Sequence, residues 1–209
     1  AEAVASGYEL VSQDPIRGRS GLQDAIDNRV LPGLAKFFGA TPGELSLTRN
    51  ATEALHLQAM GLNLTAGDEV LITTQEHPAG RSPWLLRAER HGIKVIEVFV
   101  SSPFEQAGDV VESFERAVTP RTRAIAFCHV TRGGHRYPVK QLSDMARAHG
   151  VVSLVDGAQA VGMFPIDLGD LGCDAYSASL HKWLLGPVGT GFLYVRERAR
   201  EKIQSTFAH

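Results

Sequence analysis

Short apolar segments alternate with longer amphipathic segments along most of the chain. Between several of the apolar runs, hydrophobic residues recur at helical spacing, as in "SPWLLRAERHG", "DVVESFERAV" and "PVKQLSDMARAHG". Strands that are apolar on both faces and alternate with helices predict an α/β fold of three αβα layers with a mostly parallel sheet. The runs rich in Val, Ile and small apolar residues predict strands at 44–48, 69–74, 94–100, 123–130, 151–157, 173–179 and 189–195.

The first 44 residues have helical and loop patterns and precede the predicted sheet. Within them, "QDAIDNRVLPGLAKFFGAT" predicts an amphipathic helix that is interrupted or kinked near Pro32, because proline lacks a backbone N–H. We therefore expect an N-terminal helix and loop segment at 1–44 that leads into one large domain at 45–209. Neither an internal repeat nor a low-complexity linker occurs in the sequence.

Composition fits a single domain with a full core, since 44% of the 209 residues are hydrophobic. The net charge of -2 gives no reason to expect nucleic acid or an anionic membrane as a partner. Apolar stretches are interrupted well before the about 18 residues of a transmembrane helix, and the N-terminal residues lack the layout of a secretion signal. Cys128 and Cys173 are too few for a disulfide framework or a zinc cluster. We expect both to be small buried side chains in a soluble, cytoplasmic protein.

Polar residues follow the predicted strands at the points where each strand ends. After the strand at 44–48, Asn50 or Thr52 can cap a helix whose free N–H groups face an anion such as phosphate. In a parallel sheet the carboxyl ends of the strands meet at one edge, where ligands bind. The polar residues expected at this edge are Asn50, Thr52, His77, Asp156, Gln159, Ser179, His181 and Lys182.

A phosphate site, an aromatic ring, a carboxylate and a lysine at one sheet edge match the needs of pyridoxal 5'-phosphate (PLP). Lys182 would form the Schiff base, and Asp156 would keep the pyridine nitrogen protonated so that the ring can act as an electron sink. An isolated aspartate after a strand is usually a helix cap or a turn former, so the hypothesis depends on the two residues together. The glycines of "GPVGTG" run into a strand, and so they do not form a dinucleotide-binding fingerprint.

Four motifs resemble those of the class V aminotransferase family, in the order in which that family carries them. Together with the intervening helices the resemblance covers roughly residues 15 to 200, and it is strongest with the branch of isopenicillin N epimerase-like proteins. It implies the large domain of a fold type I PLP enzyme. The motifs are "TRNATEAL" at 48–55, "QEHPAGRSPW" at 75–84, "VDGAQAVGMFPIDLGDLGCDAY" at 155–176 and "LHKWLLGPVGTGFLYVR" at 180–196.

The resemblance implies a role for each residue of the predicted site. Lys182 would carry the Schiff base and, once the substrate has freed it, move the proton at Cα. Asp156 would pair with the pyridinium nitrogen, while Gln159 would hydrogen-bond the phenolic oxygen of the ring. His77 would lie flat against the ring. The residues implied for the phosphate are Ala51, Thr52, Ser179 and His181.

Two positions of the site depart from the family pattern. Arg132 stands in "TRGG", where desulfurases carry an asparagine, and it can change contacts to cofactor or substrate. Ser179 replaces an asparagine of the nearest branch but keeps a hydroxyl for the phosphate. The resemblance further implies a homodimer, and a C-terminal small domain, with an arginine for the substrate carboxylate, that is absent from this chain.

These observations predict a PLP-dependent enzyme that acts at Cα of an amino acid or small amine by epimerisation, lyase or transamination chemistry. A cysteine desulfurase-like lyase is the first alternative, although neither cysteine lies where the mobile persulfide cysteine of that class would be. A catalytically silent PLP-fold binding or regulatory domain is the second, but such a scaffold has little need of both Lys182 and Asp156. His149 is expected at a solvated helix end. His129 is expected at a strand end, and the sequence leaves open whether it lines the site.

Overall fold

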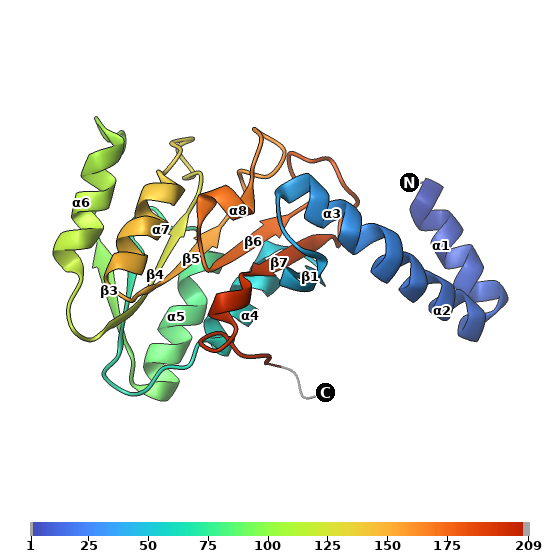
Figure 1. Ribbon diagram of the computed structural model, residues 1–209, viewed down its shortest axis with the longest axis horizontal. Coiled ribbons are helices and arrows are strands. Elements are labelled where there is room, and N and C mark those ends of the chain that lie inside the picture. Colours follow the sequence, from blue (N-terminus) through green and yellow to red (C-terminus); the bar gives the residue numbers. More distant parts are fainter. Residues whose placement is uncertain (1, 207–209) are drawn as a thin grey trace.

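A computed structural model describes residues 2–206, which form a seven-stranded sheet between two layers of helices (Figure 1). The strands are β1 (Leu45–Thr48), β2 (Glu69–Thr73), β3 (Lys94–Val98), β4 (Thr122–Cys128), β5 (Val152–Asp156), β6 (Ala175–Ser179) and β7 (Gly191–Val195). The helices are α1 (Glu2–Gln13), α2 (Pro15–Ala25), α3 (Leu31–Phe38), α4 (Ala51–Gly61), α5 (Pro78–His91), α6 (Ala107–Ala117), α7 (Val139–Ala148) and α8 (Leu168–Leu171). Shorter turns are η1 (Ile26–Val30), η2 (Pro42–Glu44) and η3 (Glu197–Ala199).

The strand order is β1-β7-β6-β5-β4-β2-β3. All neighbouring pairs are parallel except those of β7, which runs antiparallel to both β1 and β6. The other six strands therefore end at the same sheet edge, and β7 begins there. The prediction of a mostly parallel sheet is confirmed, and each predicted strand is present, with ends that differ from the prediction by one or two residues.

Alternating strand residues enter two separate hydrophobic clusters, one on each face of the sheet. On β2, Leu71 points into the cluster beneath α3, α6, α7 and α8, while Val70 and Ile72 point into the cluster beneath α4 and α5. Helical side chains complete each cluster, such as Phe114 on the first face and Trp84 on the second. Because both faces are covered by helices, the central strands β5 and β6 are buried along their whole length.

The helices before β1 form an extension that leaves the body of the molecule (Figure 1). Between α2 and α3 the helix widens into the π-helical turn η1, just before Pro32. Proline cannot donate the helical hydrogen bond and its ring displaces the preceding turn, which a π-helical turn accommodates. The predicted interruption near Pro32 is confirmed. Only α3 of this segment anchors in the core, through Ala35 and Phe38.

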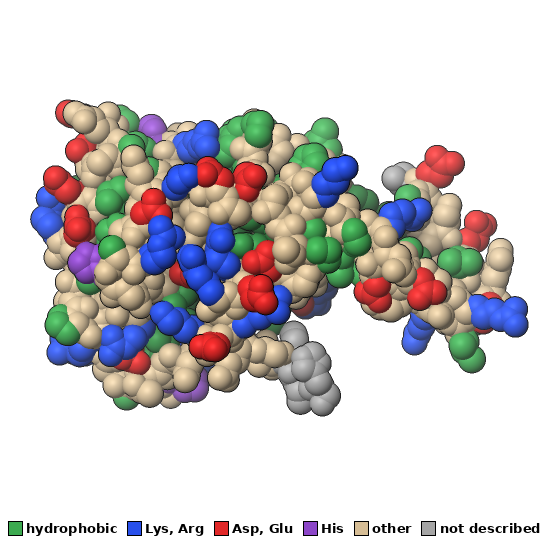
Figure 2. Space-filling model, viewed as in Figure 1, with side chains coloured by type: hydrophobic (Ala, Val, Ile, Leu, Met, Phe, Trp, Pro, Cys, Tyr) green, Lys and Arg blue, Asp and Glu red, His purple; other side chains and the backbone are tan. Residues whose placement is uncertain are grey.

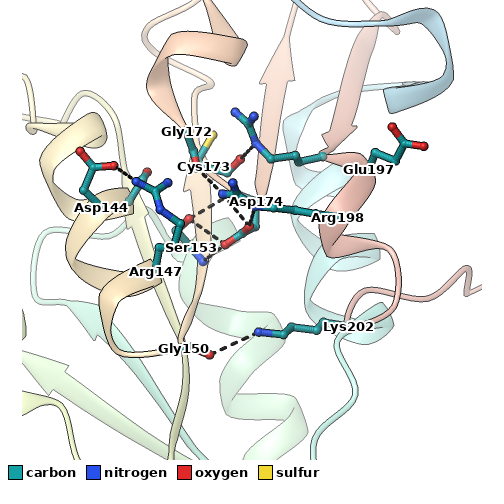
Figure 3. Close-up of polar contacts among 12 residues, drawn as sticks. Asp144, Arg147, Gly150, Ser153, Gly172, Cys173, Asp174, Glu197, Arg198 and Lys202 are labelled. Carbon is teal, nitrogen blue, oxygen red and sulfur yellow. Dashed lines mark hydrogen bonds and ion pairs between the residues drawn. The ribbon is translucent and has the colours of Figure 1, made fainter.

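A polar network secures the amino end of β6, at the sheet edge opposite the strand ends (Figure 3). The Asp174 carboxylate accepts hydrogen bonds from the backbone N–H of Ser153 at 2.9 Å and from its hydroxyl at 3.1 Å. Arg198 donates to the Gly172 carbonyl at 3.0 Å and lies 3.4 Å from Asp174. The segment that follows β7 is thereby attached to β5 and β6.

The surface over α6, α7 and α8 carries interspersed basic and acidic side chains (Figure 2). Several form close ion pairs, among them Lys140 with Asp170 and Arg147 with Asp144. No helix within residues 2–206 combines the length and the apolar character that a membrane span requires.

Candidate cofactor and active site

A cavity of about 560 Å³ lies at the carboxyl ends of the strands. Its walls come from the start of α4, the segments that follow β2, β4, β5 and β6, and the turn that precedes β7. Every residue predicted for the site lines this cavity, although the chain order scatters them over more than half of the sequence. They are Ala51, Thr52, His77, Asp156, Gln159, Ser179, His181 and Lys182.

Asp156 ends β5 at the floor of the cavity, between Cys128 on β4 and Ser177 on β6. It is buried, and its Oδ1 accepts a hydrogen bond of 2.9 Å from the Ala158 N–H. Burial raises the pKa of Asp156, while that hydrogen bond and the nearby positive charge of Lys182 oppose the rise. Among the described residues, Oδ2 has no hydrogen-bond partner. The carboxylate therefore keeps one oxygen for a donor in the cavity.

A tight turn after β5 places Gln159 beside this carboxylate. Gly157 donates to the Ser177 carbonyl at 2.8 Å, and Ala160 donates to the Gly157 carbonyl at 2.9 Å. A Cβ on Gly157 would overlap the ring of Tyr176, so only glycine lets the chain turn this closely over the buried tyrosine. The amide of Gln159 accepts a hydrogen bond of 2.9 Å at Oε1 from the indole Nε1–H of Trp183.

The start of α4 forms the wall suited to an anion. Asn50 caps the helix, since its Oδ1 accepts from the Glu53 N–H at 2.9 Å. The Ala51 N–H is bonded to the Ser179 hydroxyl at 2.9 Å, so the serine keeps its own proton for a ligand. In the part of the chain that the structure describes, neither the N–H nor the hydroxyl of Thr52 has a hydrogen-bond partner. Helix N-termini with free donors bind phosphate well.

The two cavity histidines are oriented by backbone groups. His77 caps α5, and its Nδ1 accepts a hydrogen bond of 3.1 Å from the Ala79 N–H, which places the ring proton on Nε2. His181 makes a 3.3 Å contact through Nδ1 with the Thr190 carbonyl, so there Nδ1 carries the proton. Each ring thus presents Nε2 away from its backbone partner.

Lys182 lies half-buried in the cavity wall just after β6. Its segment forms a hydrogen-bonded turn, in which Gly186 donates to the Leu180 carbonyl at 2.8 Å and Leu185 donates to the Lys182 carbonyl at 3.2 Å. Leu185 adopts a left-handed conformation with φ of 59° to close this turn. The Lys182 amine has no hydrogen bond or ion pair with any residue from 2 to 206. It is also the only lysine in the described cavity wall.

Glu76, which sequence reasoning missed, lies beneath the cavity. Its Oε1 accepts from the Thr73 hydroxyl at 2.6 Å and from the Cys128 N–H at 3.1 Å. Burial raises the pKa of Glu76 to about 7; the Thr73 bond opposes this rise and the charge of Asp156 adds to it. The sequence pattern that could have indicated Glu76 is "QEHP", where a carboxylate follows a buried strand and precedes His77.

The structure also places the remaining predicted histidines, His129 and His149, and both cysteines. His129 is buried outside the cavity wall, where its Nδ1 is 2.8 Å from the Tyr176 hydroxyl. Burial lowers the pKa of His129 to about 3, with the charge of Arg136 acting in the same direction, so this imidazole is neutral and does not line the site. His149 is exposed at the end of α7, as predicted. Cys128 and Cys173 are both free and buried, which confirms their predicted burial.

The sequence profile of the aminotransferase class V family matches residues 25–208. The chain belongs to the aminotransferase class V family. Among relatives of this family, isopenicillin N epimerase from Streptomyces clavuligerus is 36% identical over 174 residues, which is 83% of this chain and 44% of that protein. Isopenicillin N epimerase from Amycolatopsis lactamdurans is 41% identical over 169 residues, which is 78% of this chain and 42% of that protein. The chain therefore spans less than half the length of these relatives.

Other class V relatives and solved structures point to lyase chemistry in the same family. A probable cysteine desulfurase from Halalkalibacterium halodurans is 35% identical, over 77% of this chain and 40% of that protein. A complex of the cystine C–S lyase C-DES with its product, cysteine persulfide, is 30% identical with a TM-score of 0.93, covering 99% of this chain and 56% of that one. A C-DES mutant with glycine covalently linked to the PLP cofactor has a TM-score of 0.91 at 29% identity, covering 99% of this chain and 55% of that one. The predictions of the family and of the fold type I αβα architecture are confirmed.

The class V family is PLP-dependent, and the residues around the cavity fit this cofactor. A buried carboxylate with a free oxygen suits a protonated pyridine nitrogen, and the unpartnered donors of Thr52 suit a phosphate. Lys182 supplies an amine without a competing carboxylate partner among the residues that the structure describes. The donor set therefore matches the polar groups of PLP in number and kind.

Proposed function

We propose that this chain forms the PLP-binding large domain of an enzyme that acts at Cα of an amino acid or small amine, by epimerisation, lyase or transamination chemistry. The observation that carries the proposal is that the free amine of Lys182 and the buried carboxylate of Asp156 line one cavity. A domain that used the fold only as a scaffold would have no need to pair these groups across two strands. The division into a segment at 1–44 and a domain at 45–209 stays a prediction.

When bound, PLP supplies an aldehyde for covalent attachment of an amine and a ring that withdraws electrons from the attached carbon. Lys182 would hold the cofactor through its amine and, once free, would be the base that takes up and returns the proton at Cα of the substrate. Asp156 would accept the pyridine N–H at Oδ2 and so keep that nitrogen protonated. His77 would cover the ring face, and Gln159 would bind the phenolic oxygen.

The phosphate end of the cofactor is assigned to the α4 wall. The Thr52 N–H and hydroxyl would donate to phosphate oxygens, and the Ser179 hydroxyl, which accepts from the Ala51 N–H, would donate to the same group. His181 lies in the same cavity wall, and because its Nδ1 already donates to the Thr190 carbonyl, Nε2 would donate to the phosphate only from the doubly protonated ring. The uncharged donors of Thr52 and Ser179, together with the helix N-terminus, would offset part of the phosphate charge.

Arg132 is proposed to bind the substrate carboxylate in this part of the enzyme. It lines the cavity on a turn in which Thr131 donates to the His135 carbonyl at 2.9 Å and Gly134 donates to the Thr131 carbonyl at 2.9 Å. Arg49, the other arginine in the wall, is paired with Glu53 at 2.9 Å. Within residues 2–206 the Arg132 guanidinium has no such partner, so it is available for a bidentate contact with a carboxylate.

A C–S lyase or cysteine desulfurase activity is the second candidate, favoured by the desulfurase relatives and the C-DES structures. Such chemistry through a cysteine nucleophile needs an accessible thiolate. Cys128 lies in the cavity wall, but burial and the charges of Glu76 and Asp156 raise its pKa well above that of a free thiol. Cys173 is buried elsewhere, and burial raises its pKa to about 12. This chain therefore offers no activated cysteine, within the residues that the structure describes, for a desulfurase reaction.

The test is to add common L-amino acids and small amines to the PLP-loaded protein while the cofactor absorbance is followed. A change with one substrate class supports the proposal, and product analysis then separates the chemistries: a D-isomer indicates epimerisation, a keto acid indicates transamination, and released sulfur indicates C–S cleavage. The absence of any change with every amine, in protein that has bound PLP, would instead support a silent binding domain.

We further propose a cytoplasmic homodimer with cofactor sites near the subunit boundary, because two-fold dimers are the commonest assembly of soluble enzymes. Val188 lines the cavity, and its exposed side chain, with that of Leu185 three residues earlier, supports a covered surface there. Light scattering on the PLP-loaded protein should report two chains. An active, PLP-loaded monomer would contradict this assembly.

A further inference from the structure

We propose that Trp183 is a positioning residue that fixes the side-chain amide of Gln159, so that its NH2 group and not its oxygen faces the phenolic oxygen of the cofactor. This inference rests on the proposed function, because it concerns a group of PLP. It assigns a task to an aromatic residue that is 53% exposed and that core packing does not explain.

The hydrogen bond itself decides the orientation of the amide. Trp183 Nε1 lies 2.9 Å from Gln159 Oε1. An indole N–H is only a donor, so its partner has to be the amide oxygen, and the two ends of the amide cannot be exchanged. The NH2 end then lies on the other side of the carboxamide carbon. Because Gln159 also lines the cavity, this end is the one available to a ligand.

The backbone brings the two residues together by a close approach of two loops. Gly162 has φ of 93°, and a Cβ there would overlap backbone atoms of Trp183 and Leu184. The loop after β5 is therefore in direct contact with the loop that carries Lys182. Met163 donates to the Ala160 carbonyl at 3.0 Å, which holds Gly162 inside a closed turn. Both partners of the hydrogen bond thus stand on loops whose backbones are in direct contact.

The orientation of the Gln159 amide matters because of the charge on the phenolic oxygen of the cofactor. The phenolic oxygen of PLP carries negative charge, so it is stabilised by an N–H donor and destabilised by a carbonyl oxygen. Without Trp183 the amide of Gln159 is free to rotate, and a rotated amide loses the donor or presents its oxygen. Trp183 follows Lys182 directly in the chain, so the segment that anchors the cofactor also fixes the donor to its phenolic oxygen.

A double-mutant cycle on the PLP-loaded protein tests the inference, with Trp183→Phe, Gln159→Ala and the double variant. The readouts are the Kd for PLP and the pH midpoint at which bound PLP changes its absorbance. We expect Trp183→Phe to weaken PLP binding by about 2- to 10-fold, the range for one hydrogen bond, and to move the midpoint upward, because a less stabilised phenolic oxygen holds the neighbouring proton more tightly. In the Gln159→Ala background the same change should have no further effect.

The contact can also be measured without PLP. The chain has two tryptophans, and Trp84 is buried at 1% exposure in the second core cluster, outside the described wall of the cavity that Gln159 lines. Gln159→Ala should move the indole N–H resonance of Trp183 in an NMR spectrum and leave that of Trp84 unchanged, which makes Trp84 an internal control. Unchanged resonances for both would overturn the inference.

Melting temperatures show whether each variant is folded, and we expect little change for Trp183→Phe because the indole is half exposed. Equal effects of Trp183→Phe in both backgrounds, or an unchanged Kd and midpoint, would overturn the positioning role while the proposed function stands. Failure of the wild-type protein to bind PLP would overturn both together. Phe99→Leu, a change of another exposed aromatic residue, serves as the matched control and should leave every readout unchanged.

Discussion

The Ser179 hydroxyl accepts a hydrogen bond of 2.9 Å from the Ala51 N–H, although 128 residues separate the two in the chain. The bond joins the end of β6 to the first residue of α4, and so it joins the segment that carries Lys182 to the helix start assigned to the phosphate. A Cβ on Gly191 would overlap Asn50 and Thr48, so a glycine at the start of β7 permits this close packing. The lysine and the phosphate wall are thereby held at a fixed separation.

Ser179→Ala should lower the affinity for PLP by about tenfold, because it removes a hydroxyl donor to the phosphate and leaves the Ala51 N–H without its partner. Equilibrium titration with PLP measures this. Ser143→Ala is the matched control, since Ser143 is a buried serine on α7 that bonds only to the Val139 carbonyl, away from the cavity. Equal affinity losses in the two variants would show that the Ser179 effect is a general loss of stability.

Lys182→Ala should abolish covalent attachment of PLP, because Lys182 is the only lysine of the described cavity wall. Treatment of the PLP-loaded wild type with borohydride, followed by peptide mass analysis, should find the cofactor on Lys182. Lys140→Ala, which removes an exposed lysine paired with Asp170, should leave this labelling intact. A label on another lysine would contradict the site.

Asp156→Asn should reduce turnover by at least about tenfold, corresponding to the loss of about 1.4 kcal/mol of transition-state stabilisation, because a neutral amide does not hold the pyridine nitrogen protonated. Steady-state kinetics on the substrate found by the screen would measure it. Asp170→Asn, at an exposed carboxylate on α8, is the control. Near-normal turnover in Asp156→Asn would remove the proposed role of the carboxylate.

Glu76→Gln should change how stability depends on pH. The folded pKa of Glu76 is raised to about 7 from a reference of 4.5, so between these values the folded state holds a proton that the unfolded chain releases. The contribution of this group to the free energy of unfolding therefore falls by on the order of 3 kcal/mol as the pH rises through that window. At higher pH this contribution is constant. Glutamine keeps an acceptor for Thr73 and Cys128 but does not titrate.

Urea unfolding of the cofactor-free protein at several pH values between about 5 and 8 tests this, because the window of the Glu76 titration lies there. The wild type should lose stability relative to Glu76→Gln as the pH increases. Glu112→Gln, at an exposed ion pair on α6, should follow the wild type throughout. Parallel curves for the wild type and Glu76→Gln would show that the Glu76 carboxyl is ionised in the folded protein.

Asp174→Ala should lower the free energy of unfolding by about 1–3 kcal/mol, because it leaves the backbone N–H of buried Ser153 without a partner. Arg198 would lose its carboxylate at the same time (Figure 3). Since this network lies at the opposite sheet edge from the cavity, the affinity for PLP should stay within about twofold. A large loss of PLP affinity in a folded variant would show that the network at Asp174 affects the cavity at the other edge of the sheet.

Much of this protein is determined by the sequence alone. Strand and helix positions follow from short-range periodicity, because side chains alternate faces in a strand and recur every three or four residues in a helix. The parallel sheet follows from strands that are apolar on both faces, such as Val152–Asp156. Once the sheet is parallel, the residues after each strand have to meet at one edge, which is why the order of residues along the chain is enough to place Asp156 and Lys182 together.

Other features were decided only by the tertiary structure, because they depend on which distant segments touch. The periodicity of β7 does not reveal that this strand runs antiparallel between β1 and β6. Glu76 and His129 both follow buried strands, yet burial raises the pKa of the first beneath the cavity and lowers that of the second outside it. The bond from Trp183 to Gln159 crosses two loops, and local spacing carries no information on such a contact. Local patterns fix the elements and their faces, whereas the pairing of distant elements fixes the environment of each site residue.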